Sequence, residues 1–179
     1  MPEEEMNIEP LDPKRHDRTS FASGVGPVDN YLRKTANKLA QADNVRAFVL
    51  VSREGRIVGY YTLNAHDIHY SDLPGSFARN RPSHGRIPAA FISMIGVDAR
   101  YQGQGYGGLL LADALKRIYR ASRDLGIAVV LLDVLDCGDP VQVERRKQLY
   151  LRYGFRALSE APLRLYLPVA TIGQLIEAP

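Results

Sequence analysis

The chain has 179 residues and a mass of 19.9 kDa, and its 45% apolar and 24% charged residues are typical of a globular protein rather than a disordered, collagen-like or coiled-coil chain. A single cysteine, Cys137, excludes an intramolecular disulfide bond and a cysteine-rich zinc site. The net charge of +3 combines residues 1–12, with five acids and no base, and a remainder with 23 bases and 15 acids; such a basic body suits an anionic ligand such as a nucleotide or RNA, although it also serves solubility.

The chain begins with an acidic segment over residues 1–12 that lacks the basic-then-apolar order of a signal peptide. No apolar run is long enough to span a membrane. We therefore expect a cytoplasmic protein without a membrane segment.

The first half of the chain predicts a helix, a β-hairpin and a long loop. Pro27 follows a glycine-containing stretch and suits the first turn of a helix. Two apolar runs around a polar turn with a glycine predict the hairpin, and a polar stretch with three prolines predicts a functional loop. The expected boundaries are a helix over 27–42, strands over 47–51 and 57–63, and an exposed loop over 68–88.

The second half predicts strands that alternate with helices. The expected boundaries are strands over 89–97, 127–134, 155–158 and 163–167, and helices over 109–125 and 141–153. The run over 127–134 is apolar throughout, which is typical of a strand buried on both faces. We expect one α/β (α+β) domain over residues 1–179, with a mixed sheet flanked by helices. Whether a further strand precedes the first helix is left open.

The strongest motif is a glycine-rich stretch between a predicted strand and a predicted helix. Glycines let the backbone approach a ligand, and a helix N-terminus favours a phosphate. A P-loop is set aside because no lysine follows the glycines. The spacing also spells the G-x-G-x-x-G of a Rossmann site, with Asp133 near the ribose-binding position, and a plain surface turn is the third alternative. The motif consists of Gln102, Gly103, Gln104, Gly105, Tyr106, Gly107 and Gly108.

The residues Gln102-x-x-Gly105-x-Gly107 resemble the Q/R-x-x-G-x-G/A loop of the Gcn5-related N-acetyltransferases, the GNAT family. The resemblance covers roughly residues 47–167. It implies a mostly antiparallel sheet, splayed at the strand before the loop, and acetyl-coenzyme A (acetyl-CoA) as cofactor. In the family, the loop binds the pyrophosphate and the preceding strand pairs with the pantetheine amides. Ile95 and Val97 are then the residues that offer backbone groups to the cofactor.

Acetyl transfer to an amine by direct attack needs the two reactants held together, a deprotonated amine and an acid for the departing thiolate. Tyr150 lies in Tyr150-x-x-x-Gly154-Phe155, which resembles the end of the GNAT helix, and we predict that it is the acid. The alternatives are that Tyr150 only packs, or that Tyr153 serves. The further candidates for a base that orients or deprotonates the amine are His66, His69, His84, Asp133 and Asp136, and a nucleophilic role for Cys137 is the least favoured.

The front half resembles the GNAT toxins of bacterial toxin–antitoxin pairs. The matching residues are Phe21, Ser23, Gly24, Asp29, Tyr31, Leu32, Gly59, Tyr60, Tyr61 and Leu63. The resemblance implies acetylation of the α-amine of an aminoacyl-tRNA, a ribbon-helix-helix antitoxin as partner, and catalysis by Tyr150.

Basic residues near Tyr150 independently suit tRNA. Arg145, Arg146 and Lys147 are predicted to contact phosphates, and the alternative is a solvated helix face. The other candidate functions are an acetyltransferase for a small-molecule or protein amine, and a module that binds CoA without turnover. The predicted partners are acetyl-CoA, an aminoacyl-tRNA, the antitoxin and a second copy of the chain; no metal is predicted.

Overall fold

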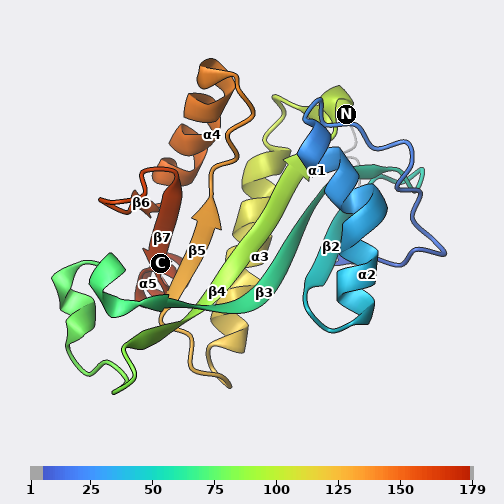
Figure 1. Ribbon diagram of the computed structural model, residues 1–179. Helices are drawn as coiled ribbons and strands as arrows, with labels where there is room; N and C mark the ends of the chain where they lie inside the picture. Colours follow the sequence, from blue (N-terminus) through green and yellow to red (C-terminus); the bar gives the residue numbers. More distant parts are fainter. Residues whose placement is uncertain (1–5, 178–179) are drawn as a thin grey trace. The chain divides into compact units, whose positions relative to one another are not determined.

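The computed structural model describes residues 6–177 (Figure 1). Its strands are β1 (Asn7–Pro10), β2 (Arg46–Val51), β3 (Ile57–His69), β4 (Arg86–Val97), β5 (Val129–Asp133), β6 (Arg156–Ala157) and β7 (Arg164–Pro168). Its helices are α1 (Gly26–Asn30), α2 (Ala36–Gln41), α3 (Tyr106–Ala121), α4 (Pro140–Arg152) and α5 (Val169–Glu177). Three acids of the N-terminal acidic segment, Glu3, Glu4 and Glu5, lie outside the described residues.

The strands within residues 6–177 form a seven-stranded sheet in the order β1-β2-β3-β4-β5-β7-β6. β4 and β5 pair in parallel, whereas β1 with β2, β2 with β3, β5 with β7 and β6 with β7 pair antiparallel. Parallel strands need a crossover connection, and α3 supplies it between β4 and β5. The predicted mixed, mostly antiparallel sheet with helices is therefore confirmed. Its predicted splay beside the glycine loop stays a prediction.

The chain divides into two compact units. Unit 1 holds the described residues up to Asn64 together with Ser93–Ala114, and unit 2 holds Ala65–Ile92 and the described residues from Leu115 onward. β3, β4 and α3 contribute residues to both units. That residues 1–179 act as a single domain stays a prediction.

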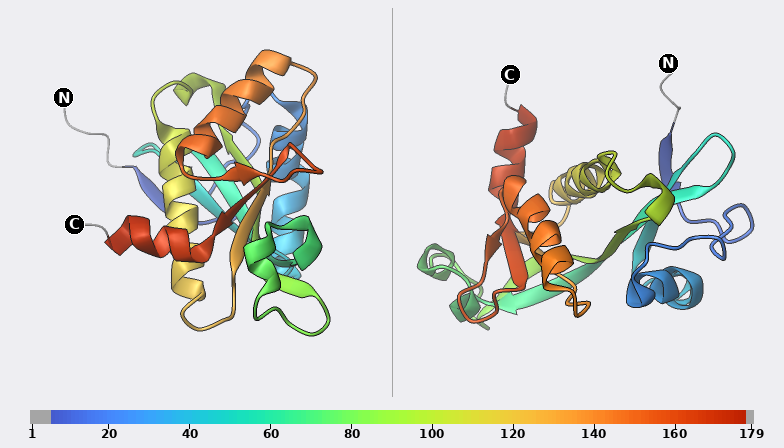
Figure 2. Two further views of the ribbon diagram at one scale, coloured as in Figure 1. Left: turned by 90° about the vertical axis from the view of Figure 1, so that its left-hand side faces the viewer. Right: turned by 90° about the horizontal axis from the view of Figure 1, so that it is seen from above.

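In unit 1, the predicted helix over 27–42 is confirmed, but it contains a wider turn. α1 and α2 are joined without a break by a π-helical turn over Tyr31–Thr35, and α2 lies beside β2 (Figure 2). Val28, Leu32 and Ala36 are buried at intervals of four residues, which places them on one face of the helix. The other large, fully buried side chains of this unit are Phe21, Leu50, Ile57, Tyr60, Tyr61, Leu110 and Leu111.

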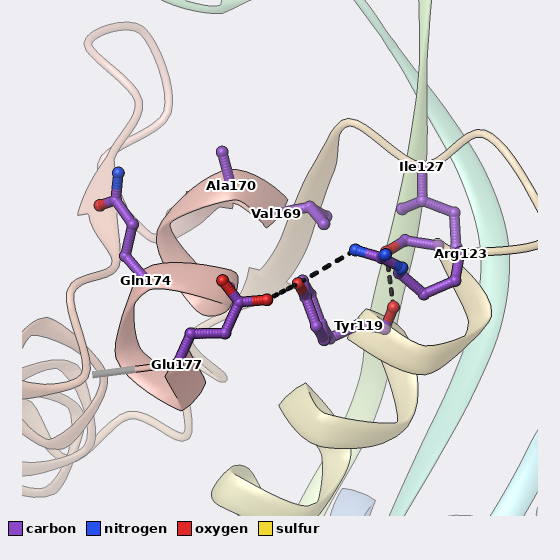
Figure 3. Close-up of a pocket in the computed structure, with 9 residues that line it drawn as sticks. Tyr119, Arg123, Ile127, Val169, Ala170, Gln174 and Glu177 are labelled. Carbon is purple, nitrogen blue, oxygen red and sulfur yellow. Dashed lines mark hydrogen bonds between the residues drawn. The ribbon is translucent and has the colours of Figure 1, made fainter. Parts of the chain in front are cut away.

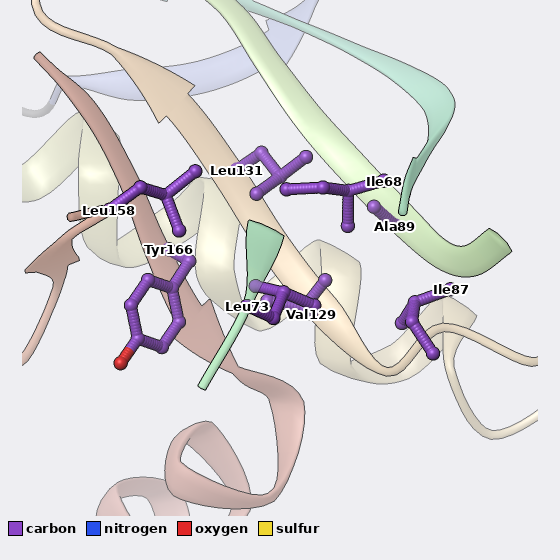
Figure 4. Close-up of a cluster of buried hydrophobic side chains, with 8 residues drawn as sticks. All are labelled: Ile68, Leu73, Ile87, Ala89, Val129, Leu131, Leu158 and Tyr166. Atoms are coloured by element: carbon purple, nitrogen blue, oxygen red, sulfur yellow. The ribbon is translucent and has the colours of Figure 1, made fainter. Parts of the chain in front are cut away.

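In unit 2, β5 is the centre of the core. Its residues Val129–Leu132 are at most 1% exposed, as the continuous apolar run predicts for a strand covered on both faces. A cluster of buried side chains packs on one face of the strands (Figure 4). The unit 2 cluster consists of Ile68, Leu73, Ile87, Ala89, Val129, Leu131, Leu158 and Tyr166. Leu73 anchors the β3–β4 connection to the core.

The loop predicted over 68–88 is shorter at both ends. β3 continues to His69 and β4 begins at Arg86, so the connection covers residues 70–85 and contains two short 3₁₀ turns. Ile68 and Ile87 both belong to the unit 2 cluster, and burying them keeps the flanking strands extended. The prolines and polar residues around them concealed these strand ends in the sequence.

α3 begins and ends earlier than the helix predicted over 109–125. It starts at Tyr106, with Gly107 and Gly108 in its first turn, although glycine lowers the intrinsic preference for a helix. It ends at Ala121 because the N–H groups of Arg123 and Asp124 bond three residues back instead of four, which tightens the last turn.

α5 has no counterpart in the predicted elements. Its sequence contains several β-branched residues and Gly173, which lower the intrinsic preference for a helix. Tertiary packing decides here, because Val169 and Ile172 are buried and Gly173 lies against the ring of Tyr119. β6 spans two residues of the strand predicted over 155–158. Within residues 6–177, no helix is long and apolar enough to cross a membrane.

The packing of α1 on β4 in unit 1 can be tested at Gly96. A Cβ at this residue would lie 2.4 Å from Cγ1 of Val28. We expect Gly96→Ala to lower the free energy of unfolding by about 1–3 kcal/mol, because overpacking a filled site costs that much. Urea unfolding followed by circular dichroism measures the change.

The matched control is Gly126→Ala, since nothing among the described residues lies within 4 Å of a Cβ there. Adding Val28→Ala to Gly96→Ala should restore part of the stability. Equal unfolding midpoints for Gly96→Ala and the unmodified protein would contradict the close packing.

Candidate active site

The glycine loop lies in unit 1 between Val97, the last residue of β4, and Tyr106, the first of α3. Gly103 and Gly105 have φ angles of +77° and +87°, in the left-handed region that favours glycine. Among the described residues, no atom lies within 4 Å of a Cβ built at either position. The loop therefore offers an open side on which a ligand can approach the backbone.

The start of α3 adds an electrostatic preference to this open loop. α3 spans 16 residues, so its dipole places partial positive charge at its first turn, and the N–H groups of that turn point out of the helix. Residues 102–105 are exposed. A loop with this geometry suits the phosphates of a nucleotide.

A buried carboxylate holds the start of the loop. Asp98 is 1% exposed, and its two oxygens accept hydrogen bonds from the N–H of Ala22 at 3.1 Å and from the N–H, Nε and Nη2 of Arg100, each at 2.9 Å. Burial by itself would raise the pKa of Asp98, but the hydrogen bonds from Arg100 and Ala22 outweigh it and leave the pKa below its ordinary value. Asp98 is therefore ionised at neutral pH and ties the segment around Ala22 to the end of β4.

Gln102 supports the loop through its side chain. Its amide nitrogen Nε2 donates to the carbonyl oxygens of Ser23 at 2.8 Å and of Val97 at 2.9 Å. The sequence analysis predicts that Gln102 binds the cofactor, and this role stays a prediction. In the structure, its amide nitrogen bonds two backbone carbonyl groups of unit 1. Its side chain thus joins three segments: the N-terminal segment, the end of β4 and the loop.

Ser23 is itself held by Asp29 of α1. The carboxylate of Asp29 accepts hydrogen bonds from the backbone N–H and the hydroxyl of Ser23, both at 2.7 Å, and both side chains are 8% exposed. These two residues contribute to the resemblance to GNAT toxins, but the sequence assigns them no structural role. The two hydrogen bonds go to the same oxygen, Oδ1 of Asp29, and close the segment over residues 23–29.

The last residues of β4 run toward the loop. Ser93–Val97, which include the predicted cofactor-binding residues Ile95 and Val97, are all half-buried. The oxygen of Val97 is the one that accepts the Gln102 amide. Gly96 lies between Ile95 and Val97 in the strand. The side chain of Val28 from α1 packs against Gly96, so α1 covers this part of β4.

Tyr150 belongs to unit 2 and lies near the end of α4. The carboxylate of Asp139 begins the helix by accepting the N–H groups of Val141 and Gln142, so the helix predicted over 141–153 is confirmed with the bounds Pro140–Arg152. Gly154, with a φ of +96°, follows the helix in the left-handed conformation typical of its C-terminal cap. The chain therefore reverses directly after the turn that carries Tyr150.

The ring of Tyr150 is 5% exposed and packs edge-on against Phe155, with ring centres 6.3 Å apart. Burial raises the pKa of Tyr150 to about 12, although the positive charge of Arg146 opposes the shift. The phenol is therefore neutral at any physiological pH. A neutral phenol is the protonation state that a proton donor needs.

The other candidate bases have structural partners in unit 2. The carboxylate of Asp133 binds Arg164, and Asp136 accepts the N–H of Gly138. The ring of His66 contacts the ring of Phe91, and His69 forms hydrogen bonds with Ser71. His84 accepts a hydrogen bond from the backbone N–H of Arg86. Tyr153 is half-buried at the C-cap of α4. Their predicted roles in catalysis stay predictions.

The three basic residues before Tyr150 do not form one stripe. Consecutive residues of a helix point about 100° apart, so Arg145, Arg146 and Lys147 face three directions. Arg145 is exposed, whereas Nη1 of Arg146 donates to Sγ of Cys137 at 3.3 Å. This hydrogen bond is the largest contribution that lowers the pKa of the Cys137 thiol. Arg145 and Lys147 remain the better candidates for phosphate contacts.

A hollow in unit 2 contains none of the predicted site residues (Figure 3). It measures about 550 Å³ and lies between the end of α3 and α5. The hydroxyl of Tyr119 donates to Glu177 at 2.9 Å and accepts from Arg123 at 3.3 Å across its wall (Figure 3). These contacts fasten α5 to α3.

Residues 44–157 match the model of the acetyltransferase (GNAT) domain family. The match includes β4, the glycine loop, α3, β5 and α4. The chain belongs to the GNAT acetyltransferase family. The Rossmann interpretation is therefore set aside, and the predicted resemblance is confirmed. That the glycine loop binds the cofactor, rather than forming a plain surface turn, stays a prediction.

Two relatives of this GNAT chain are named as toxins. It is 56% identical over 170 residues to the probable toxin TacT of Sinorhizobium fredii, and the match covers 94% of each chain. It is 34% identical over 151 residues to the tRNA-acetylating toxin of Mycobacterium tuberculosis, covering 84% of this chain and 85% of the relative. The predicted likeness to GNAT toxins is thereby confirmed over most of the sequence.

Solved structures of GNAT toxins share the fold. A tyrosine-to-phenylalanine mutant of KacT superposes with a TM-score of 0.84 at 26% identity, covering 95% of this chain and 98% of KacT. The AtaTR structure bound with acetyl-CoA gives a TM-score of 0.80 at 26% identity, covering 96% and 98%. The strand order and the placement of the helices along the chain are thus those of a known fold.

The open side of the glycine loop leads to a prediction at Gly105. We expect Gly105→Asp to weaken acetyl-CoA binding at least tenfold more than Gly105→Asn, because the two side chains have the same size and both tolerate a positive φ, but only Asp brings a negative charge toward the phosphates. Titration calorimetry with acetyl-CoA measures both. Equal affinities for the two variants would show that the loop does not face the pyrophosphate.

Proposed function

We propose that the protein is a toxin of a toxin–antitoxin pair that transfers the acetyl group of acetyl-CoA to the α-amine of an aminoacyl-tRNA. The observation that carries the proposal is the combination of an open glycine loop at a helix start with a buried, neutral tyrosine at the end of α4. The names of the two relatives and the acetyl-CoA in AtaTR support it. The reaction is placed in the cytoplasm, where charged tRNA is found.

The residues of unit 1 fit a coenzyme A molecule. The loop has room on its open side, because a Cβ at Gly103 or Gly105 would meet no atom of the described residues within 4 Å. We assign the pyrophosphate to the backbone of Gln102–Gly108 and the pantetheine arm to the backbone of Ile95 and Val97. The bound cofactor supplies a thioester whose carbonyl carbon accepts the amine.

The chemistry is a direct transfer. The neutral amine attacks the thioester carbonyl carbon, a C–N bond forms, and the C–S bond breaks. The departing thiolate takes a proton from the hydroxyl of Tyr150, and the phenolate regains one from the nitrogen that becomes the amide. Because the pKa of Tyr150 is raised to about 12, the phenolate is the less stable form and this return is favourable.

Two observations support aminoacyl-tRNA as the acceptor: the charge of the chain and its similarity to a tRNA-acetylating toxin. Beyond residue 12, the chain has 23 bases and 15 acids, which favours a polyanion over a neutral metabolite. The tRNA-acetylating toxin of Mycobacterium tuberculosis is 34% identical over most of the chain. An acetyltransferase for a small-molecule or protein amine is the second candidate, and a CoA-binding module without turnover is the third. We further propose a ribbon-helix-helix antitoxin that neutralises the toxin, and a homodimer as the free form.

Mass spectrometry of tRNA-linked amino acids after expression separates these candidates. N-acetylated aminoacyl-tRNA supports the proposal, free acetylated amines support the second candidate, and the absence of any product supports the third. Expression without an antitoxin should arrest growth.

The proposed acid can be tested by Tyr150→Phe, which keeps the buried ring and removes the proton. We expect kcat to fall about 100-fold or more while the Kd for acetyl-CoA stays nearly unchanged, as for the loss of a positioned acid. Single-turnover kinetics with aminoacyl-tRNA and calorimetry with acetyl-CoA measure the two quantities.

The pH profile supplies the control. An ordinary tyrosine loses its proton near pH 10, whereas Tyr150 keeps it until about pH 12. The rate should therefore not decline between pH 8 and 10 through loss of this proton. Tyr153→Phe should leave kcat within about threefold of the unmodified enzyme. An unchanged kcat in Tyr150→Phe would show that Tyr150 only packs and does not donate the proton.

The proposed phosphate contacts can be tested by reversing two charges on α4. We expect Arg145→Glu with Lys147→Glu to raise the KM for aminoacyl-tRNA and to flatten its salt dependence, by about one unit of slope for each phosphate that the variant no longer neutralises. Arg146 is spared because it bonds Cys137. Initial rates at several salt concentrations measure the effect.

The matched control reverses Lys116 and Arg120, two exposed basic residues of α3. It changes the net charge equally and should leave the KM and its salt dependence nearly unaltered. If both double variants behave alike, the effect comes from net charge and not from a contact on α4.

A further inference from the structure

Unit 2 carries a group of planar side chains that the proposed chemistry does not use. The ring of His66 lies 5.3 Å from the ring of Phe91, with the two planes inclined by 34°, and Cζ of Arg164 lies 5.7 Å from the centre of the same phenylalanine ring. His66 is exposed, and the other two are half-buried. We name these three residues the shelf.

The strand register places the shelf on one face of the sheet. Phe91 is opposite Leu131 in the β4–β5 pair, and Arg164 is opposite Asp133 in the β5–β7 pair. Leu131 and Asp133 are two residues apart on β5, so they point to the same side. Phe91 and Arg164 therefore share the face that carries the unit 2 cluster of Figure 4, and His66 contacts Phe91 from β3.

Two of the three shelf residues, Phe91 and Arg164, are held in place by their contacts. Phe91 packs against the unit 2 cluster below it. Arg164 makes two hydrogen bonds with the carboxylate of Asp133, from Nε to Oδ1 at 2.7 Å and from Nη2 to Oδ2 at 2.8 Å. This two-point bond fixes the guanidinium plane. A rigid flat surface loses little conformational entropy when a flat ligand covers it.

The same ion pair decides which ligand the shelf suits. Asp133 balances the charge of Arg164, so the guanidinium offers a flat face rather than a net positive charge for a phosphate. Aromatic rings and arginine planes of this kind stack on unpaired nucleobases, and unpaired RNA ends are recognised in this way. The chemistry therefore favours a base over a phosphate.

Cationic groups for the adjoining phosphates lie in the same unit. In the connection over 70–85, Cζ of Arg81 lies 4.1 Å from the ring centre of Tyr70, and Arg79 is exposed. The end of β5 at Asp133 also leads, through residues 134–139, to the start of α4, on which Tyr150 lies. Shelf, cations and proposed acid thus belong to one unit.

We propose that the shelf binds an unpaired nucleobase of the acceptor's 3′ end by stacking, and so positions the charged end of the tRNA. The inference rests on the proposed function, since it names how that same acceptor is held. His66, Phe91 and Arg164 are positioning residues, and none of them exchanges a proton with the reacting amine.

The test uses the uncharged ribotrinucleotide CCA, which ends every tRNA, and an abasic trinucleotide with the same phosphates. Fluorescence anisotropy should show that the protein binds CCA more tightly than the abasic probe. Phe91→Leu should raise the Kd for CCA about tenfold, as for the loss of one stacked base, and should leave the abasic probe unaffected. The KM for aminoacyl-tRNA should rise with kcat nearly unchanged.

Matched variants separate stacking from folding. His66→Phe and Phe91→Tyr keep a ring and should keep the affinity for CCA, whereas His66→Gln should reduce it in part. Arg164→Lys retains the charge opposite Asp133 but lacks the flat face, and should weaken CCA binding. The Kd for acetyl-CoA should stay the same in all of them, which reports intact folding.

Each outcome decides one claim. If Phe91→Leu binds CCA as the unmodified protein does, or if the unmodified protein does not distinguish CCA from the abasic probe, the shelf is refuted while tRNA acetylation stands. If no aminoacyl-tRNA is acetylated but CCA affinity still falls in Phe91→Leu, the proposed function fails and the shelf remains a site for unpaired RNA.

Discussion

The glycine loop depends on the burial of one ionised carboxylate. Asp98 is 1% exposed, and an isolated charge at that depth would cost several kcal/mol. Its cost is offset because its two oxygens accept four N–H groups, three of them from Arg100 and one from Ala22. The segment around Ala22 is thereby bound to the end of β4. Removing the carboxylate would leave N–H donors without their acceptor and would release the segment around Ala22 from the end of β4.

The hydrogen bonds of Gln102 and Asp29 extend this constraint. Gln102 bonds the carbonyl of Ser23, and Ser23 is held by Asp29 at the start of the helical segment. Gly96 completes the arrangement, because the space that a side chain would occupy is filled by Val28 of α1. The residues between β1 and α1 thus shape the glycine loop, although they precede it by about eighty positions in the chain.

Burial has opposite consequences in the two units. Asp98 stays charged because donors surround it, whereas Tyr150 stays neutral because burial raises its pKa to about 12 with a single positive charge opposing. In unit 2, the pairing of Arg164 with Asp133 also removes the need for a phosphate partner and leaves a flat surface. The proposed roles follow from these differences: the loop binds phosphate, the tyrosine gives a proton, and the shelf stacks a base.

The sequence by itself determined the order of most helices and strands, the glycine loop and the family, because glycine spacing, apolar periodicity and caps are local signals. It identified Tyr150 as the candidate acid through the Y-x-x-x-G-F pattern, whose Gly154 ends α4. It missed α5, whose β-branched residues and glycine favour no helix, since tertiary contacts of Val169, Ile172 and Glu177 stabilise it. Tertiary structure alone decided the partners of Asp98 and the contacts of Phe91 with His66 and Arg164, because hydrogen bonds and ring contacts between distant segments leave no periodic trace in the chain.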